Sequence, residues 1–219
     1  MISLDAFLRR SVSEWGCHAV GSEFSHPLDN RGGLQNLVGT MEPLEPPDTH
    51  YLSAALGWLE LGNAAESICE LGQIRPENVN HPDVLEVRWM VLARLEDWNG
   101  ALLAARELVQ QAPTRASGWL HHSYALRRVA TGGLQAAWEA LLPAWEQFPK
   151  EPIIAYNLAC YACQLGEGRH AMVWLRRAMD VGEKMHIRAM ALADEDLKPL
   201  WPSIRRFSSR GKPRPRSGQ

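Results

Sequence analysis

The sequence has few cysteines and no long apolar run. Its four cysteines are too few and too irregularly spaced along 219 residues for the disulfide framework of a secreted protein. The longest run without a charged residue, 152–166, is shorter than the roughly 20 residues that a membrane-spanning helix needs, and it contains Asn157 and Gln164. These shortages predict a protein of the reducing cytoplasm without a membrane-spanning segment.

The first residues do not predict an export signal, and the sequence carries no excess of charge of one sign. Asp5, Arg9 and Arg10 interrupt the stretch where a secretion signal peptide needs an unbroken apolar run. The formal net charge is only -2, which argues against attraction of the whole protein to nucleic acid or to an anionic membrane. Local charged patches remain possible.

No catalytic signature is found in the sequence. It has neither the G-x-S-x-G of serine hydrolases, nor a glycine-rich phosphate loop, nor the H-E-x-x-H of zinc proteases. The glycines at 132 and 133 lengthen a turn and are not followed by the Lys-Ser/Thr pair of a nucleotide site. The sequence therefore predicts a protein that is not an enzyme and uses no cofactor and no metal.

The chain does contain a helical repeat. Apolar residues recur with helical spacing from residue 51 to about 193, and the β-branched clusters typical of strands are missing, so the fold class is all-α. Sliding the sequence on itself by about 34 residues aligns four segments, each a turn followed by a helix with a small residue at a fixed place. These small residues are Ser67, Ala101, Ala137 and Ala171. Another helix precedes each turn, so each unit is a helix hairpin.

These hairpins resemble the tetratricopeptide repeat (TPR) family. The second hairpin departs from the family pattern at Trp89, where a small residue is usual, and the first departs at Ser67. The fourth unit matches the family best, at Leu158, Ala159, Gly166, Ala171 and Ala178. The resemblance covers about 48–179 and implies a right-handed superhelical array of hairpins, a TPR-like α-solenoid of about four repeats plus a capping helix.

Four regions follow from this reading. Residues 1–47 form an N-terminal arm with a short amphipathic helix, and 48–193 form the repeat domain. Residues 194–207 form a C-terminal cap, and 208–219 a basic disordered tail. Within 184–198 we expect one apolar set to cover the last hairpin and one charged set to face water. The apolar set is Met185, Ile187, Met190 and Leu192, and the charged set is Asp194, Glu195, Asp196 and Lys198.

The resemblance also implies where a partner binds. In TPR arrays the first helix of each hairpin lines a concave groove that binds peptides. Tyr124 and Tyr156 would offer rigid contact area, Asn157 would bond a peptide backbone, and two arginines would receive an acidic group. Carried onto this register, the partner-binding residues are Met90, Arg94, His121, Tyr124, Arg127, Arg128, Tyr156, Asn157, Cys160 and Cys163. The sequence predicts a protein-interaction scaffold or adaptor.

Three alternatives stay open. The N-terminal helix can gate the groove of a dedicated chaperone or regulator, or mediate self-association. The tyrosines and arginines can be merely solvated or covered by the N-terminal arm. Thirdly, Cys160 and Cys163 can handle a thiol or metal reaction, but they lie in mid-helix, without the helix N-terminus that activates a redox C-x-x-C pair and without a second ligand pair for zinc.

Overall fold

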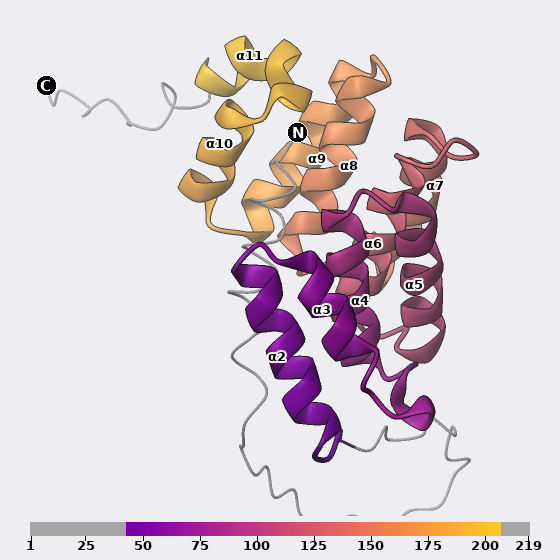
Figure 1. Ribbon diagram of the computed structural model, residues 1–219. Coiled ribbons are helices and arrows are strands. Elements are labelled where there is room, and N and C mark those ends of the chain that lie inside the picture. Colours follow the sequence, from indigo (N-terminus) through magenta and orange to yellow (C-terminus); the bar gives the residue numbers. More distant parts are fainter. Residues whose placement is uncertain (1–42, 207–219) are drawn as a thin grey trace, which may run out of the picture.

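Every helix and turn described below lies within residues 43–206 of a computed structural model, and within that range no strand occurs (Figure 1). The all-α prediction is confirmed. The elements are α2 (Asp48–Glu60), α3 (Ala64–Leu71), η1 (Pro76–Asn78), α4 (Pro82–Arg94), α5 (Trp98–Gln111), α6 (Ala116–Leu126), α7 (Leu134–Gln147), α8 (Pro152–Gln164), α9 (Gly168–Val181), α10 (Lys184–Ala193), η2 (Glu195–Leu200) and α11 (Trp201–Arg206).

Consecutive helices pair as hairpins that stack in chain order (Figure 1). The pairs are α2 with α3, α4 with α5, α6 with α7, and α8 with α9, as the repeat predicts. The last three elements follow the fourth hairpin: α10 packs on α9, and η2 packs on α8. Residues 43–206 thus form an α-solenoid of four hairpins followed by a C-terminal cap.

The four small residues that define the repeat lie in the interior of the array. Ser67, Ala101, Ala137 and Ala171 are all fully buried. In the first hairpin the Ser67 hydroxyl donates a hydrogen bond to the carbonyl oxygen of Ala55, at 2.7 Å. Because its one polar group is satisfied, serine replaces the usual alanine there at little cost.

The turns inside the hairpins require a left-handed backbone residue. Gly62 and Gly166 supply it in the first and fourth hairpins, with φ of 80° and 84°. Glu96 takes the same conformation in the second, with φ of 57°, although a side chain disfavours it. The third turn is longer, and its backbone reverses at Gly133, with φ of 120°.

Trp89 occupies the place where the TPR family prefers a small residue. Its side chain is fully buried and stacks on the His121 ring of α6, with centroids 3.8 Å apart and planes only 5° from parallel. It also makes an edge contact with the Tyr124 ring, with centroids 5.8 Å apart. The large residue therefore fills the space between the second and third hairpins.

A buried carboxylate ties the start of α2 to the connection that follows the first hairpin. Asp48 accepts hydrogen bonds from the backbone N–H and Nε of Arg75, at 3.2 and 2.9 Å, and from the amide of Asn78. Burial by itself would raise the pKa of Asp48, but the bonds from Asn78 and Arg75 outweigh it and hold the pKa below its ordinary value.

The C-terminal cap differs from the sequence prediction in three residues. Ile187 is buried as expected, whereas Met185 is 60% exposed, so its predicted covering role is wrong. Asp194 and Asp196, predicted to face water, are only 2% and 8% exposed. The two carboxylates find hydrogen-bond partners inside the fold, which is why they are buried.

Two further predictions concern the ends of the chain and the membrane. The N-terminal amphipathic helix and the basic tail at 208–219 lie outside the described residues. Among the described helices, none combines the length and the apolar character needed to cross a membrane.

Candidate functional site

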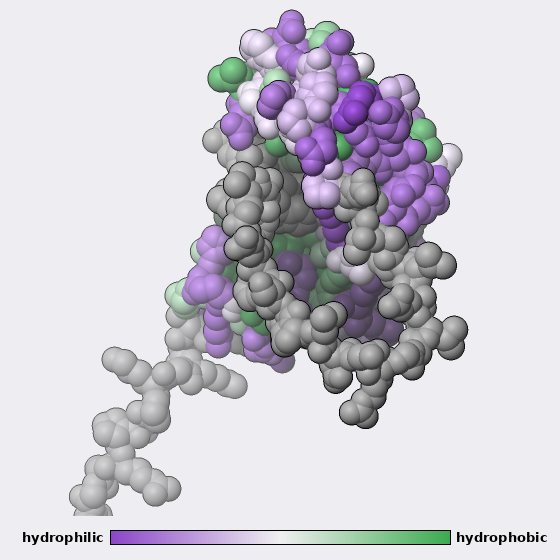
Figure 2. Space-filling view, turned by 90° about the horizontal axis from the view of Figure 1, so that it is seen from below, coloured by the Kyte–Doolittle hydropathy of each residue, from purple (hydrophilic) through white to green (hydrophobic). Residues whose placement is uncertain are grey.

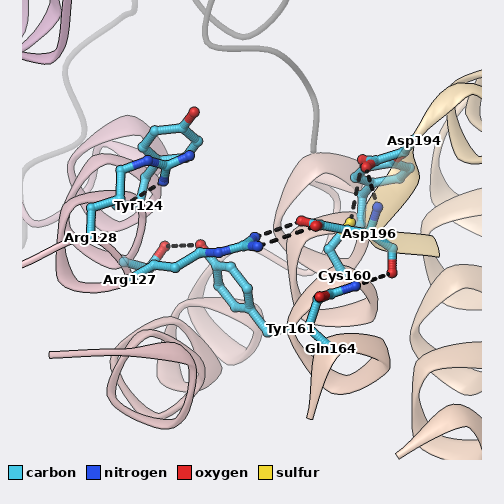
Figure 3. Close-up of polar contacts among 10 residues, drawn as sticks. Tyr124, Arg127, Arg128, Cys160, Tyr161, Gln164, Asp194 and Asp196 are labelled. Carbon is cyan, nitrogen blue, oxygen red and sulfur yellow. Dashed lines mark hydrogen bonds and ion pairs between the residues drawn. The ribbon is translucent and has the colours of Figure 1, made fainter. Parts of the chain in front are cut away.

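The predicted partner-binding residues come from α4, α6 and α8, the first helices of the last three hairpins, and from the two residues that follow α6. Seen from below, the molecule is hollowed, and apolar residues line part of the hollow (Figure 2). The residues of α6 and α8 converge with the C-terminal segment, by which we mean residues 194–200 (Figure 3). Two groups of contacts result: one on that segment and one around Arg128.

Arg127 and Gln164 hold the middle of the C-terminal segment. The Arg127 guanidinium binds the Asp196 carboxylate with both terminal nitrogens, Nη1 to Oδ2 at 2.6 Å and Nη2 to Oδ1 at 3.2 Å (Figure 3). The Gln164 amide donates to the backbone carbonyl oxygen of Asp196 at 2.8 Å. A bidentate guanidinium–carboxylate pair is among the stronger and more directional polar contacts in proteins.

Asp194 is held by donors from two directions. Its Oδ2 accepts a hydrogen bond from the Tyr156 hydroxyl at 3.0 Å and lies 3.6 Å from the Cys160 thiol, which also donates to it. Its Oδ1 accepts from the backbone N–H of Asp196 at 3.0 Å, which caps η2. These donors compensate a carboxylate that is almost entirely removed from water.

The predicted groove residues of α8 are buried in this arrangement. All four are buried: Tyr156, Asn157, Cys160 and Cys163. Tyr156 and Cys160 donate hydrogen bonds to Asp194 of the cap. The Asn157 amide donates to the carbonyl oxygen of Ile153 in its own helix, at 2.9 Å. Contact of these residues with a partner stays a prediction, and it requires the C-terminal segment to leave α8.

The same cluster contains the atoms that a metal site would need. One group of three, Cys160, Asp194 and Asp196, brings its ligand atoms within 4.8 Å of one another in the described part of the chain. Burial, followed by the charges of both aspartates, raises the pKa of the Cys160 thiol well above its ordinary value, and burial also raises that of Cys163. A protonated thiol is a poor ligand and a poor nucleophile, and the carboxylates already bind Arg127 and Tyr156. The three atoms lie close enough to hold an ion, but the protonated thiol and the existing bonds of the carboxylates argue against the thiol or metal hypothesis.

Arg128 forms the second group of contacts. Its guanidinium carbon lies 3.5 Å from the centroid of the Tyr124 ring and 4.8 Å from that of Trp98, at the start of α5. Its Nη1 also donates to the carbonyl oxygen of Tyr124, at 2.9 Å. Two rings and a backbone bond thus fix the position of this cation at the end of α6, where it is half-buried.

The remaining predicted residues divide between packing and surface. Met90 and His121 are buried, and the His121 ring stacks on Trp89. Arg94, the last residue of α4, is exposed. The sequence did not indicate Trp98, because only the tertiary fold brings this residue beside Arg128 at the end of α6.

The Arg127–Asp196 pair makes a prediction about acid stability. Burial alone would raise the pKa of Asp196, but the hydrogen bonds and charge of Arg127 dominate and lower it. Because the folded-state pKa lies below the unfolded one, the stabilisation is complete above about pH 4 and is lost as pH falls through the folded-state pKa. Asp196→Asn should lower the free energy of unfolding by about 1 kcal/mol at pH 7 and by less at pH 3.

Urea unfolding at pH 7, 5, 4 and 3 measures this difference. Glu195→Gln is the matched control, because Glu195 is an exposed neighbour whose ion pair with Lys198 lies in solvent. It should follow the wild-type curve at every pH. A wild-type advantage over Asp196→Asn that is as large at pH 3 as at pH 7 would contradict the assignment.

Solved structures of other proteins have a similar helical fold. No family model and no curated protein matches the sequence. A thermophilic TPR protein from Thermus thermophilus is 21% identical, with a TM-score of 0.58 over 74% of this chain and 84% of that one. MamA from Desulfovibrio magneticus RS-1 is 15% identical, with a TM-score of 0.56 over 78% and 100%. A further MamA crystal structure is 17% identical, with a TM-score of 0.56 over 74% and 88%. At these identities the likeness establishes the fold.

Proposed function

We propose that this chain, which has the fold of the tetratricopeptide-repeat proteins, is a non-enzymatic adaptor that binds an acidic segment of a partner protein on its concave face. The observation that carries the proposal is the packing of Arg128 against the rings of both Tyr124 and Trp98, whose centroids themselves lie 6.0 Å apart. A guanidinium does not act as an acid or base at neutral pH, so the chemistry of this group is recognition of an anion.

This packing of Arg128 has the properties of an interaction hot spot. Arginine and aromatic side chains are enriched among the residues that dominate binding energies. An arginine that is already held by two rings loses little conformational entropy when it binds a carboxylate, so more of the contact energy contributes to affinity. Tyr124 is itself buried, only 6% exposed, so its contribution is to hold the cation rather than to contact the partner broadly.

The second hairpin carries an arginine at the position equivalent to that of Arg128. Counted from the first residue of each helix, Arg94 of α4 stands at the place that Arg128 has beyond the end of α6. It is exposed. Two cations at equivalent positions of neighbouring repeats favour a partner segment that runs across the repeats and carries acidic residues. This specifies a partner by its chemistry and leaves its identity to experiment.

Arg128→Ala should weaken binding of such a partner about ten-fold, because it removes the fixed cation and leaves the hairpins intact. Partners are recovered on immobilised wild-type protein from an extract of the source organism, and the affinity of each purified partner is then measured by titration calorimetry. Arg169→Ala is the matched control, since Arg169 is an exposed arginine on the outer helix α9.

The outcome separates recognition from general charge effects. Loss of affinity with Arg128→Ala and not with Arg169→Ala supports the proposal. Equal affinity of all three proteins for every recovered partner contradicts it. Binding through the cation should also weaken as salt rises, because exposed charge pairs are screened.

A further inference from the structure

The C-terminal segment lies on α8 and reaches the end of α6, on the side where the TPR resemblance places a bound peptide (Figure 3). We propose that residues 194–200 are an intramolecular ligand, which occupies a recognition site for acidic segments until a partner segment of the same chemistry displaces it. This inference rests on the proposed binding of an acidic partner, and it adds the motif that the site recognises and the way in which access is regulated.

The receiving side chains are those of a recognition site. Arg127, Tyr156, Cys160 and Gln164 all donate to the segment, and they come from two successive repeats. Together they bind two carboxylates and one backbone carbonyl, the groups that an acidic peptide presents. A cap that only shielded the apolar end of the array would need none of these donors.

The segment itself shows which motif fits. Its two bound carboxylates, Asp194 and Asp196, are separated by one residue, and the next residue, Leu197, is fully buried. Glu195 and Lys198 are exposed, so their positions are not selected. The site therefore recognises an acidic residue, any residue, a second acidic residue and then leucine.

The geometry also allows exchange. The segment forms a six-residue 3-10 helix, a type with poorer hydrogen-bond geometry than an α-helix, and Pro199 lies inside it. The Arg127–Asp196 pair is partly open to solvent, with side-chain exposures of 18% and 11%, so a competing carboxylate can reach it. An incoming acidic segment re-forms each bond that the leaving one breaks, so the polar exchange is close to balanced.

A labelled peptide of residues 193–206 tests the proposal when it is added to the full-length protein in trans. The variant Asp196→Ala plus Leu197→Ala removes two anchors of the segment and leaves every receiving residue unchanged. It should bind the peptide about ten-fold more tightly than wild type in fluorescence anisotropy, because its own segment no longer competes. Glu195→Ala plus Lys198→Ala, two exposed positions of the same segment, is the control and should behave as wild type.

We call Asp196→Ala plus Leu197→Ala the loosened variant. Adding Arg127→Ala to it should abolish the increase in peptide affinity, which would place the peptide at this site. A peptide with asparagine in place of both aspartates should bind no better to the loosened variant than to wild type. If the loosened variant is folded by circular dichroism and binds the acidic peptide no more tightly than wild type, the segment is a fixed cap and the proposal is overturned.

A second measurement keeps the proposal testable if the loosened variant does not fold. Excess acidic peptide added to the wild-type chain should accelerate amide hydrogen exchange in residues 194–200, whereas unchanged exchange would overturn displacement. These results are independent of the Arg128 experiment, which uses a natural partner. A failed peptide exchange leaves binding at Arg128 intact, and a failed Arg128 test leaves the exchange result intact.

Discussion

Trp89→Ala is expected to lower the free energy of unfolding by about 3–5 kcal/mol, the range observed for truncating a large aromatic residue in a core. The side chain is fully buried, and its removal leaves the His121 ring without the stacking partner that now lies 3.8 Å away. The cavity would open between α4 and α6, where two hairpins join, so separated parts of the array would lose cooperativity.

The TPR family pattern predicts the opposite result, because alanine would restore the small residue that is usual at this place. The two expectations differ because a family preference describes an average contact, whereas Trp89 fills a space that its neighbours in this chain have adapted to. Trp89→Phe keeps part of the ring and should lose only about 1–2 kcal/mol.

Urea unfolding followed by far-ultraviolet circular dichroism measures both variants without using tryptophan fluorescence. Leu103→Ala is the control, since this leucine is 66% exposed on α5 and its loss should change stability by less than about 0.5 kcal/mol. If Trp89→Ala costs no more than Leu103→Ala, the stacked pair does not hold the second and third hairpins together.

The repeat itself could be predicted from the sequence, and the reason is physical. Small residues such as Ala101 and Ala137 recur because the helix backbones approach closely there, and any larger side chain would push the helices apart. A constraint that acts at one position per repeat leaves a visible period in the sequence. The hairpins, their order and the longer third turn all follow from that period.

The C-terminal cluster could be predicted only in part, because its contacts are not local. The register placed Arg127 where it would receive an acidic group, and an acidic group lies there, but it belongs to the same chain. Asp194 and Asp196 stand in a charged run that by itself predicts a solvated face. Their burial depends on Tyr156 and Arg127, which are 38 and 69 residues away in the sequence.

The long third turn joins the fold to the site, and Gly132→Ala should disrupt it at a cost of at least about 2–3 kcal/mol. A Cβ at Gly132 would collide with the carbonyl oxygen of Leu126, which is backbone and cannot turn aside. The same oxygen accepts the N–H of Gly133 at 2.9 Å, so moving it would break the bond that closes the turn. Arg127 and Arg128 directly follow Leu126 and would shift with it.

Replacing Gly57 with alanine should stabilise the protein, whereas the same change at Gly132 should destabilise it. Gly57 lies inside α2, and among the described residues no atom beyond the neighbouring backbone of that helix lies within 4 Å of where its Cβ would be. Alanine there should raise the free energy of unfolding by about 0.5–1 kcal/mol, because the unfolded chain loses conformational freedom and the helix gains a better former. Urea unfolding of the two variants side by side compares one added methyl group in two settings. The expectation fails if both substitutions change the free energy of unfolding in the same direction, or if Gly132→Ala stays within about 0.5 kcal/mol of wild type. Either result would mean that the third turn relaxes and does not hold Arg127 and Arg128 in place.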